Sequence, residues 1–156
     1  PGQTPDSFEK TLERVCNLNP EHISAYSLII EPGTPFFDKY GEAGSAVSEE
    51  TDREIYARTK KYLEARGYLR YEISNYSKKG FECRHNLGYW RRTPYIGFGI
   101  AAASLLGDKR TTTHSDISKF IEGDFSGESE ILTKEDDAKF CAAVIKEKAP
   151  KDIKSL

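Results

Sequence analysis

The chain has 156 residues, enough for one domain with its own core or for part of a larger domain. Its 23 lysine and arginine residues nearly balance its 25 aspartate and glutamate residues, which gives a formal net charge of -2. Because a near-neutral chain has no overall field that attracts polyanions, we expect neither nucleic acid nor an anionic membrane surface as a partner.

The longest apolar stretch, residues 96–106, is interrupted by glycines and is far shorter than the roughly 20 residues that a membrane-spanning helix needs, so no membrane span is predicted. Cys16, Cys83 and Cys141 are odd in number and widely spaced, which fits neither a disulfide framework nor a closed set of metal ligands. We therefore expect a cytoplasmic protein. The chain begins at Pro1 and contains no methionine, so we interpret it as a piece of something longer.

Alternating helix and strand patterns fill the first part of the chain. Thr4 as a cap and Pro5 in the first turn predict a helix of about 12 residues. Residues 22–30 are apolar or small on both alternating faces, which is typical of a strand covered on both sides in a parallel sheet. Residues 31–35, which include two prolines and a glycine, predict a turn.

A second helix is predicted from Ser48, as its cap, to Gly67, as its stop. The strict alternation of residues 69–74 then predicts a strand with one solvated face, on which Glu72 is expected to face solvent rather than to be a buried acid with a raised pKa. The order helix, strand, helix, strand predicts right-handed crossovers and a parallel sheet.

The second half is less regular. Short helices are predicted for residues 84–90 and 115–121, and a loop for residues 124–130. Thr133 followed by Asp136 resembles a capping box and predicts the start of a last helix.

The densest group of chemically versatile side chains lies in residues 81–92, which hold a thiol, an imidazole, the only tryptophan and three guanidinium groups. On a helix, His85 and Tyr89 share one face, as do Asn86 and Trp90. A flat aromatic ligand bearing carboxylates would stack on Tyr89 or Trp90, pair with the arginines and take His85 as an axial or hydrogen-bonding partner.

The alternative is a packing role, in which the aromatic residues fill a core, the arginines are solvated and His85 makes one structural hydrogen bond; the spacing alone favours this alternative. Gly97 and Gly99 lack the third glycine of a dinucleotide fingerprint, so close packing of small residues is the favoured interpretation there. His22 and His114 have no obvious relay partner and are assigned no catalytic role.

Five segments occur in a fixed order: residues 1–4, 19–28, 31–35, 71–75 and 83–90. Together they closely resemble the oxygen-independent coproporphyrinogen III oxidase-like radical S-adenosylmethionine family, over about residues 1–122. The His-Asn-x-x-Tyr-Trp element that starts at His85 resembles the haem chaperone branch of that family. In the family pattern Gly-x-Gly-x-x-Ala-His-Ser, this chain has Ala103 at the histidine position.

The resemblance implies an α/β fold made of the terminal units of a partial (β/α) TIM-like barrel, residues 1–75, followed by a mostly helical carboxy-terminal region. Residues 76–156 would be the linker and the start of the tetrapyrrole-side region. The family binds S-adenosylmethionine and a 4Fe-4S cluster, which is held by a Cys-x-x-x-Cys-x-x-Cys loop that this sequence does not contain. By this resemblance Ile29 would lie beside the bound nucleoside, and no metal ligand is expected in the chain.

By the same resemblance, the candidate haem contacts are His85, Asn86, Tyr89 and Trp90. Two functions remain open: part of a radical S-adenosylmethionine protein that handles haem or coproporphyrinogen, as an oxidase or as a chaperone, and a non-catalytic haem-binding or interaction module. Whether the parent protein is an enzyme is left open, and the chain alone is expected to be inactive. A barrel cut open would expose an unpaired edge, so we also expect self-association.

Overall fold

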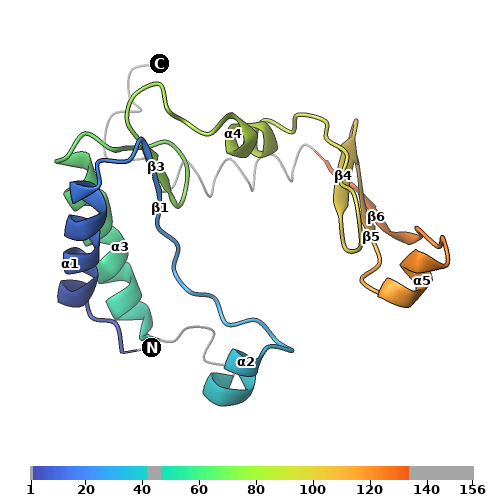
Figure 1. The fold of residues 1–156 in the computed structure, drawn as a ribbon, viewed down its shortest axis with the longest axis horizontal. Helices are drawn as coiled ribbons and strands as arrows, with labels where there is room; N and C mark the ends of the chain where they lie inside the picture. Colours follow the sequence, from blue (N-terminus) through green and yellow to red (C-terminus); the bar gives the residue numbers. More distant parts are fainter. Residues whose placement is uncertain (1, 42–46, 134–156) are drawn as a thin grey trace. The chain divides into compact units, whose positions relative to one another are not determined.

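The computed structural model describes residues 2–41 and 47–133, and the chain divides into two compact units, Pro1–Cys83 and Arg84–Leu156 (Figure 1). We call them unit 1 and unit 2. The last helix predicted to start at Thr133 lies outside the described residues. In the described part of the chain, every helix is too short or too polar to span a bilayer.

Two helices of unit 1 begin at the caps that the sequence predicted. Helix α1 (Pro5–Asn17) starts with a capping box, in which Thr4 Oγ1 accepts from the backbone N–H of Ser7 and the Ser7 hydroxyl accepts from that of Thr4. Helix α3 (Glu49–Glu64) is capped by the hydroxyl of Ser48. A further short helix, α2 (Pro35–Tyr40), begins inside the predicted turn because Thr34 caps it and proline is well tolerated in its first turn.

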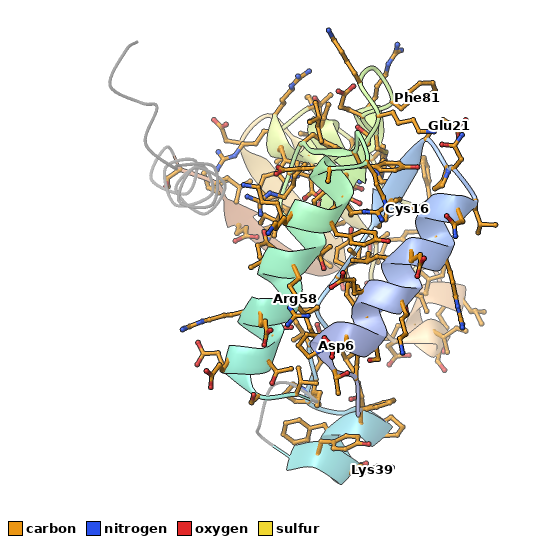
Figure 2. The ribbon with its side chains drawn as sticks, turned by 90° about the vertical axis from the view of Figure 1, so that its left-hand side faces the viewer. Asp6, Cys16, Glu21, Lys39, Arg58 and Phe81 are labelled. Carbon is orange, nitrogen blue, oxygen red and sulfur yellow. The ribbon has the colours of Figure 1, made fainter. Side chains whose placement is uncertain are left out.

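The core of unit 1 lies where α1 and α3, side by side in Figure 2, cover one face of a small sheet. Leu63 is fully buried, and Leu12 lies beside it in the core. Tyr68 and Tyr76 belong to the same core, and each exposes less than 3% of its surface. Burial of this kind stabilises by about 1.5–3 kcal/mol per large apolar side chain, so the helices are held mainly by this contact.

The sheet of unit 1 is antiparallel between neighbours, and the predicted parallel sheet is therefore wrong for the described strands. Its order is β1 (His22–Ser24), β3 (Asn75–Ser77), β2 (Leu69–Arg70). Since β3 runs against both neighbours, β1 and β2 run in the same direction but do not touch. The predicted order of helices and strands implied that β1 and β2 run in the same direction. It did not predict that β3 lies between them, because that pairing joins residues far apart in the chain.

Both predicted strands of unit 1 are shorter than expected. The ladder of β1 ends at Ser24, well before residue 30. The predicted strand 69–74 is interrupted by a turn, in which the Tyr71 backbone N–H donates to the Asn75 carbonyl at 3.2 Å. This turn brings Asn75 back along the sheet to begin β3.

Unit 2 begins with α4 (Arg84–Trp90), at the bounds that the sequence predicted, and contains α5 (Ile117–Ile121) within the other predicted range. The predicted mostly helical region is wrong for the residues on either side of α5, which form an antiparallel sheet in the order β4 (Ala103–Leu106), β5 (Lys109–Thr113), β6 (Gly127–Ile131). The predicted loop 124–130 therefore contains most of a strand.

The hairpin of β4 and β5, which was not predicted, forms because of the two residues that connect these strands. Gly107, with φ of 60°, and Asp108 form a two-residue connection between β4 and β5. Two-residue hairpin loops need positive φ, which glycine adopts without steric cost. The Gly-Asp pair, followed after Lys109 and Arg110 by three threonines, was a readable hairpin signal.

Candidate functional site

Helix α4 carries the side chains that the sequence singled out, and its end is fixed by backbone geometry. The Thr93 N–H donates to the Gly88 carbonyl at 2.9 Å and the Arg92 N–H donates to the Tyr89 carbonyl at 3.1 Å. Arg92 itself has φ of 51°. This is the Schellman arrangement that ends a helix at a left-handed residue, and Pro94 follows it.

Three aromatic rings follow one another from α4 toward β4. His85 and Tyr89, one helical turn apart, meet edge to face with centroids 4.8 Å apart. Tyr89 meets Tyr95 in the same way at 4.9 Å. Both centroid distances lie within the favourable range for aromatic contacts. The His85 imidazole is therefore packed against Tyr89 on one side, although His85 as a whole is exposed.

The three histidines differ in what their ring nitrogens do. Nε2 of His22 lies 2.8 Å from the Tyr71 hydroxyl, and Nε2 of His114 lies 2.7 Å from the Asp124 carbonyl oxygen. The imidazole of His85 makes no hydrogen bond within residues 2–41 and 47–133, and only its ring contact with Tyr89 is formed there. His85 is therefore the histidine whose nitrogens are available to a ligand.

Within the described residues, α4 does not carry the fully buried aromatic side chains that the packing alternative expects. No residue of α4 is buried, and Tyr89 exposes 45% of its surface. Asn86 and Trp90 are half-buried on the same helix. The four predicted contact residues thus share one short, accessible helix, with Arg84 exposed at its start and Arg91 exposed just after its end.

Unit 1 carries a polar sheet face that the sequence analysis missed. The register places His22 opposite Ser77 and Ser24 opposite Asn75, so these side chains share one face. The Ser24 hydroxyl donates to the Asn75 side-chain oxygen, and Asn75 Nδ2 donates to the Tyr26 hydroxyl at 3.2 Å. The alternation of polar residues at positions 22, 24 and 26 was the available signal.

Glu72 is buried, with 8% of its surface exposed, so the expectation that it faces solvent is wrong. Its Oε1 accepts from the Ser74 backbone N–H at 3.0 Å. The carboxylate thus satisfies a backbone donor in the turn between β2 and β3, as a group buried there requires.

Ile29 lies in unit 1 and exposes 72% of its surface. It is not among the residues lining a nearby pocket of about 120 Å³, which lies between α1, α3 and residues 25–28. The pocket is lined mainly by apolar and aromatic side chains from these three elements: Phe8, Ala25, Tyr26, Leu28, Ile55 and Tyr56.

The described residues do not fit an iron-sulfur cluster. They contain no group of three or more histidine, cysteine, aspartate or glutamate side chains placed to hold a metal ion. Cys16 and Cys83 are free thiols, and burial raises the pKa of the Cys16 thiol, which disfavours the thiolate that a metal needs. Helix α4 offers a different set of groups, an exposed imidazole beside an exposed aromatic ring.

Sequence comparison identifies relatives, although no protein-family model matches the chain. The chain is 37% identical over 123 residues to "Heme chaperone HemW" of Bacillus subtilis, covering 78% of this chain and 32% of that protein. It is 38% identical over 104 residues to "Heme chaperone HemW" of Escherichia coli, covering 65% of this chain and 26% of that protein. The chain thus spans about a third or less of the length of these relatives.

A third relative, from Danio rerio, is "Radical S-adenosyl methionine domain-containing protein 1, mitochondrial", at 38% identity over 65% of this chain and 23% of that protein. The fold is similar to that of coproporphyrinogen III oxidase (HemN) from Escherichia coli, described as a radical SAM enzyme, with a TM-score of 0.68 and 21% identity over 91% of this chain and 37% of that one.

These similarities define the class first: the chain is related in sequence to a radical S-adenosyl methionine domain-containing protein, and its fold is similar to that of a coproporphyrinogen III oxidase. Within that class, its sequence relatives include several proteins named heme chaperone HemW, so the resemblance inferred from the five ordered segments is confirmed. The mixed α/β character is also confirmed, whereas the described sheets are small and open.

Proposed function

We propose that this chain is part of a radical S-adenosylmethionine protein of haem or porphyrin metabolism and that α4 contacts the tetrapyrrole. The observation that carries the proposal is the accessible imidazole of His85, packed against Tyr89 within the His-Asn-x-x-Tyr-Trp element. The names of the sequence relatives, which include heme chaperones, point to the same ligand class.

In this proposal His85 binds haem iron or donates a hydrogen bond to the tetrapyrrole, while Tyr89 and Trp90 offer ring faces and Asn86 a polar contact. Arg84 and Arg91 are exposed and pair with the carboxylates of the ligand. Haem, when bound, would supply an iron, and His85 is the residue of this chain that would hold it. The residues of this chain orient the macrocycle and neutralise its acidic groups.

We further propose that residues 1–75 form the last units of a partial (β/α) barrel and that residues 76–156 begin the tetrapyrrole-side region. Support comes from unit 1, where α1 and α3 cover one face of the sheet and the polar side chains of His22, Ser24 and Asn75 lie on the other. In a barrel the helices lie outside and the site lies at the ends of the strands. In this proposal S-adenosylmethionine binds near Ile29. A 4Fe-4S cluster would need ligands from elsewhere in a longer protein, and we propose that this protein is cytoplasmic.

A second candidate is a non-catalytic haem-binding or interaction module. It is favoured by the described residues, which hold no set of cluster ligands, because reductive cleavage of S-adenosylmethionine requires that cluster. The two candidates share haem binding at α4 and differ in whether the complete protein carries a cluster. Self-association is proposed for both, supported by exposed apolar side chains such as Phe98 and Ile121, and sedimentation measures it directly.

A haem titration followed by Soret absorbance tests the shared part of the proposal. We expect saturable binding by the chain and its loss, or a shift of the Soret band, in His85→Ala. His22→Ala and His114→Ala are matched controls that remove an imidazole already engaged within the protein, and they should leave the affinity within about twofold. Absence of binding, or equal effects of all three variants, would contradict a ligand at α4.

A further inference from the structure

The seven-residue helix α4 is too short to hold its side chains in place by itself. Isolated helices shorter than about 12–15 residues are marginal in water, and none of the residues of α4 is buried within the described structure. Contacts outside the helix therefore decide how well the orientation of His85 is held.

Tyr95 supplies such a contact. Its backbone forms a two-way bridge with Leu105 of β4, with Tyr95 N–H donating to the Leu105 carbonyl at 3.0 Å and Leu105 N–H donating to the Tyr95 carbonyl at 2.9 Å. Leu105 is buried, with 4% of its surface exposed, and its strand is paired along its length with β5. The backbone of Tyr95 is thus part of the sheet of unit 2.

From this anchored backbone the ring of Tyr95 reaches Tyr89, and Tyr89 reaches His85. The interplanar angles are 77° and 85°, so both contacts are edge to face and each restricts the rotation of the next ring. The helix end turns between them, since Arg92 is left-handed and Thr93 donates to Gly88. The sheet of unit 2 is therefore connected to His85 through two consecutive aromatic contacts, Tyr95 to Tyr89 and Tyr89 to His85.

We propose that Tyr95, which was not among the predicted contact residues, is a positioning residue that sets the orientation of His85 through Tyr89. The inference rests on the proposed tetrapyrrole site, and it deepens that proposal by naming the residue that preorganises it. Preorganisation of this kind raises affinity because the ligand does not have to order the side chain on binding.

NMR of the ligand-free chain tests the proposal without haem. We expect nuclear Overhauser contacts from Tyr95 to Tyr89 and from Tyr89 to His85 in the unaltered chain. In Tyr95→Leu the His85 imidazole protons should move toward their random-coil shifts, whereas Tyr95→Phe, which keeps the ring, should retain them. Phe98→Leu is the matched control, because Phe98 is 90% exposed and lies in the same segment.

Haem titration of the same variants measures the consequence. We expect Tyr95→Leu to weaken binding by about two- to tenfold and to broaden or shift the Soret band, with Tyr95→Phe restoring both. Failure of the unaltered chain to bind haem would refute the proposed function while the NMR result still decides the role of Tyr95. Missing ring contacts in the unaltered chain, or His85 signals indifferent to Tyr95→Leu, would overturn the positioning role.

Discussion

The two units are held together by different forces. Unit 1 buries a contiguous core in which Leu12, Ile23 and Leu63 meet two tyrosines beneath a pair of long helices. In the described part of unit 2, Leu105 is the one large apolar side chain that is buried, while Phe98, Ile121 and others are mostly exposed. Among residues 84–133, order comes chiefly from the backbone ladders of β4, β5 and β6.

The comparison teaches that the candidate ligand site lies on the part of the chain with little apolar burial. Regions with few buried apolar contacts open locally at low free-energy cost, which is common for segments that bind ligands. The orientation of His85 therefore depends on a few specific contacts, whereas α1 and α3 are held by many equivalent ones.

Leu63→Ala should have the largest effect on stability. Leu63 is fully buried in the core of unit 1, and a leucine-to-alanine change at such a site removes apolar burial and leaves a cavity, at a cost of about 2–5 kcal/mol. Urea denaturation followed by far-ultraviolet circular dichroism measures the loss. Leu106→Ala is the control in unit 2, because Leu106 is 59% exposed, and it should change the free energy of unfolding by no more than about 0.5 kcal/mol. Equal losses would mean that the two units do not differ in this way.

Gly97→Ala should destabilise unit 2 although it removes no contact. A Cβ atom at Gly97 would lie 2.2 Å from the Ala103 carbonyl oxygen, so the loop before β4 would have to shift, at a cost of about 1–3 kcal/mol. Gly88→Ala in α4 is the matched control, because its Cβ would meet Thr93 at an ordinary 3.8 Å and alanine favours a helix. Fluorescence of Trp90 during urea denaturation reports on this unit; a loss in Gly88→Ala as large as that in Gly97→Ala would refute the steric explanation.

The smallest expected effect is a pH dependence confined to unit 2. Backbone N–H groups of Lys119 and Ser118 donate to Asp116 and hold the pKa of its carboxyl below its usual value of 3.8, and the hydroxyl and N–H of Ser126 do the same for the pKa of Asp124. Because the folded pKa is the lower one, these carboxylates stabilise the fold above the unfolded value, and the contribution is lost as pH falls through the folded value.

Amide hydrogen exchange at Ser118 and Lys119 measures this effect. Protection should fall in strong acid in the unaltered chain and should be low at every pH in Asp116→Ala. Asp116→Asn keeps an acceptor that does not titrate, so its protection should not depend on pH in this range. The caps of α1 and α3 are the hydroxyls of Thr4 and Ser48, which do not titrate, so these helices should lack the same dependence. An equal acid response at those caps would contradict the assignment.

Much of the local structure was predictable from the sequence because its signals are short in range. Thr4 and Ser48 mark helix starts through hydrogen bonds within one turn, and the short helix predicted for residues 84–90 is α4. The grouping of His85, Asn86, Tyr89 and Trp90 on one helix was likewise a matter of spacing.

Tertiary structure decided what depends on residues far apart in the chain. The sequence by itself determined where helices begin and which side chains share α4, because capping and helical periodicity are local. The antiparallel insertion of β3, the burial of Glu72 and the anchoring of Tyr95 on Leu105 were decided only by the fold. The physical reason is that strand pairing and ring contacts join residues whose proximity is set by the path of the backbone, which no local pattern specifies.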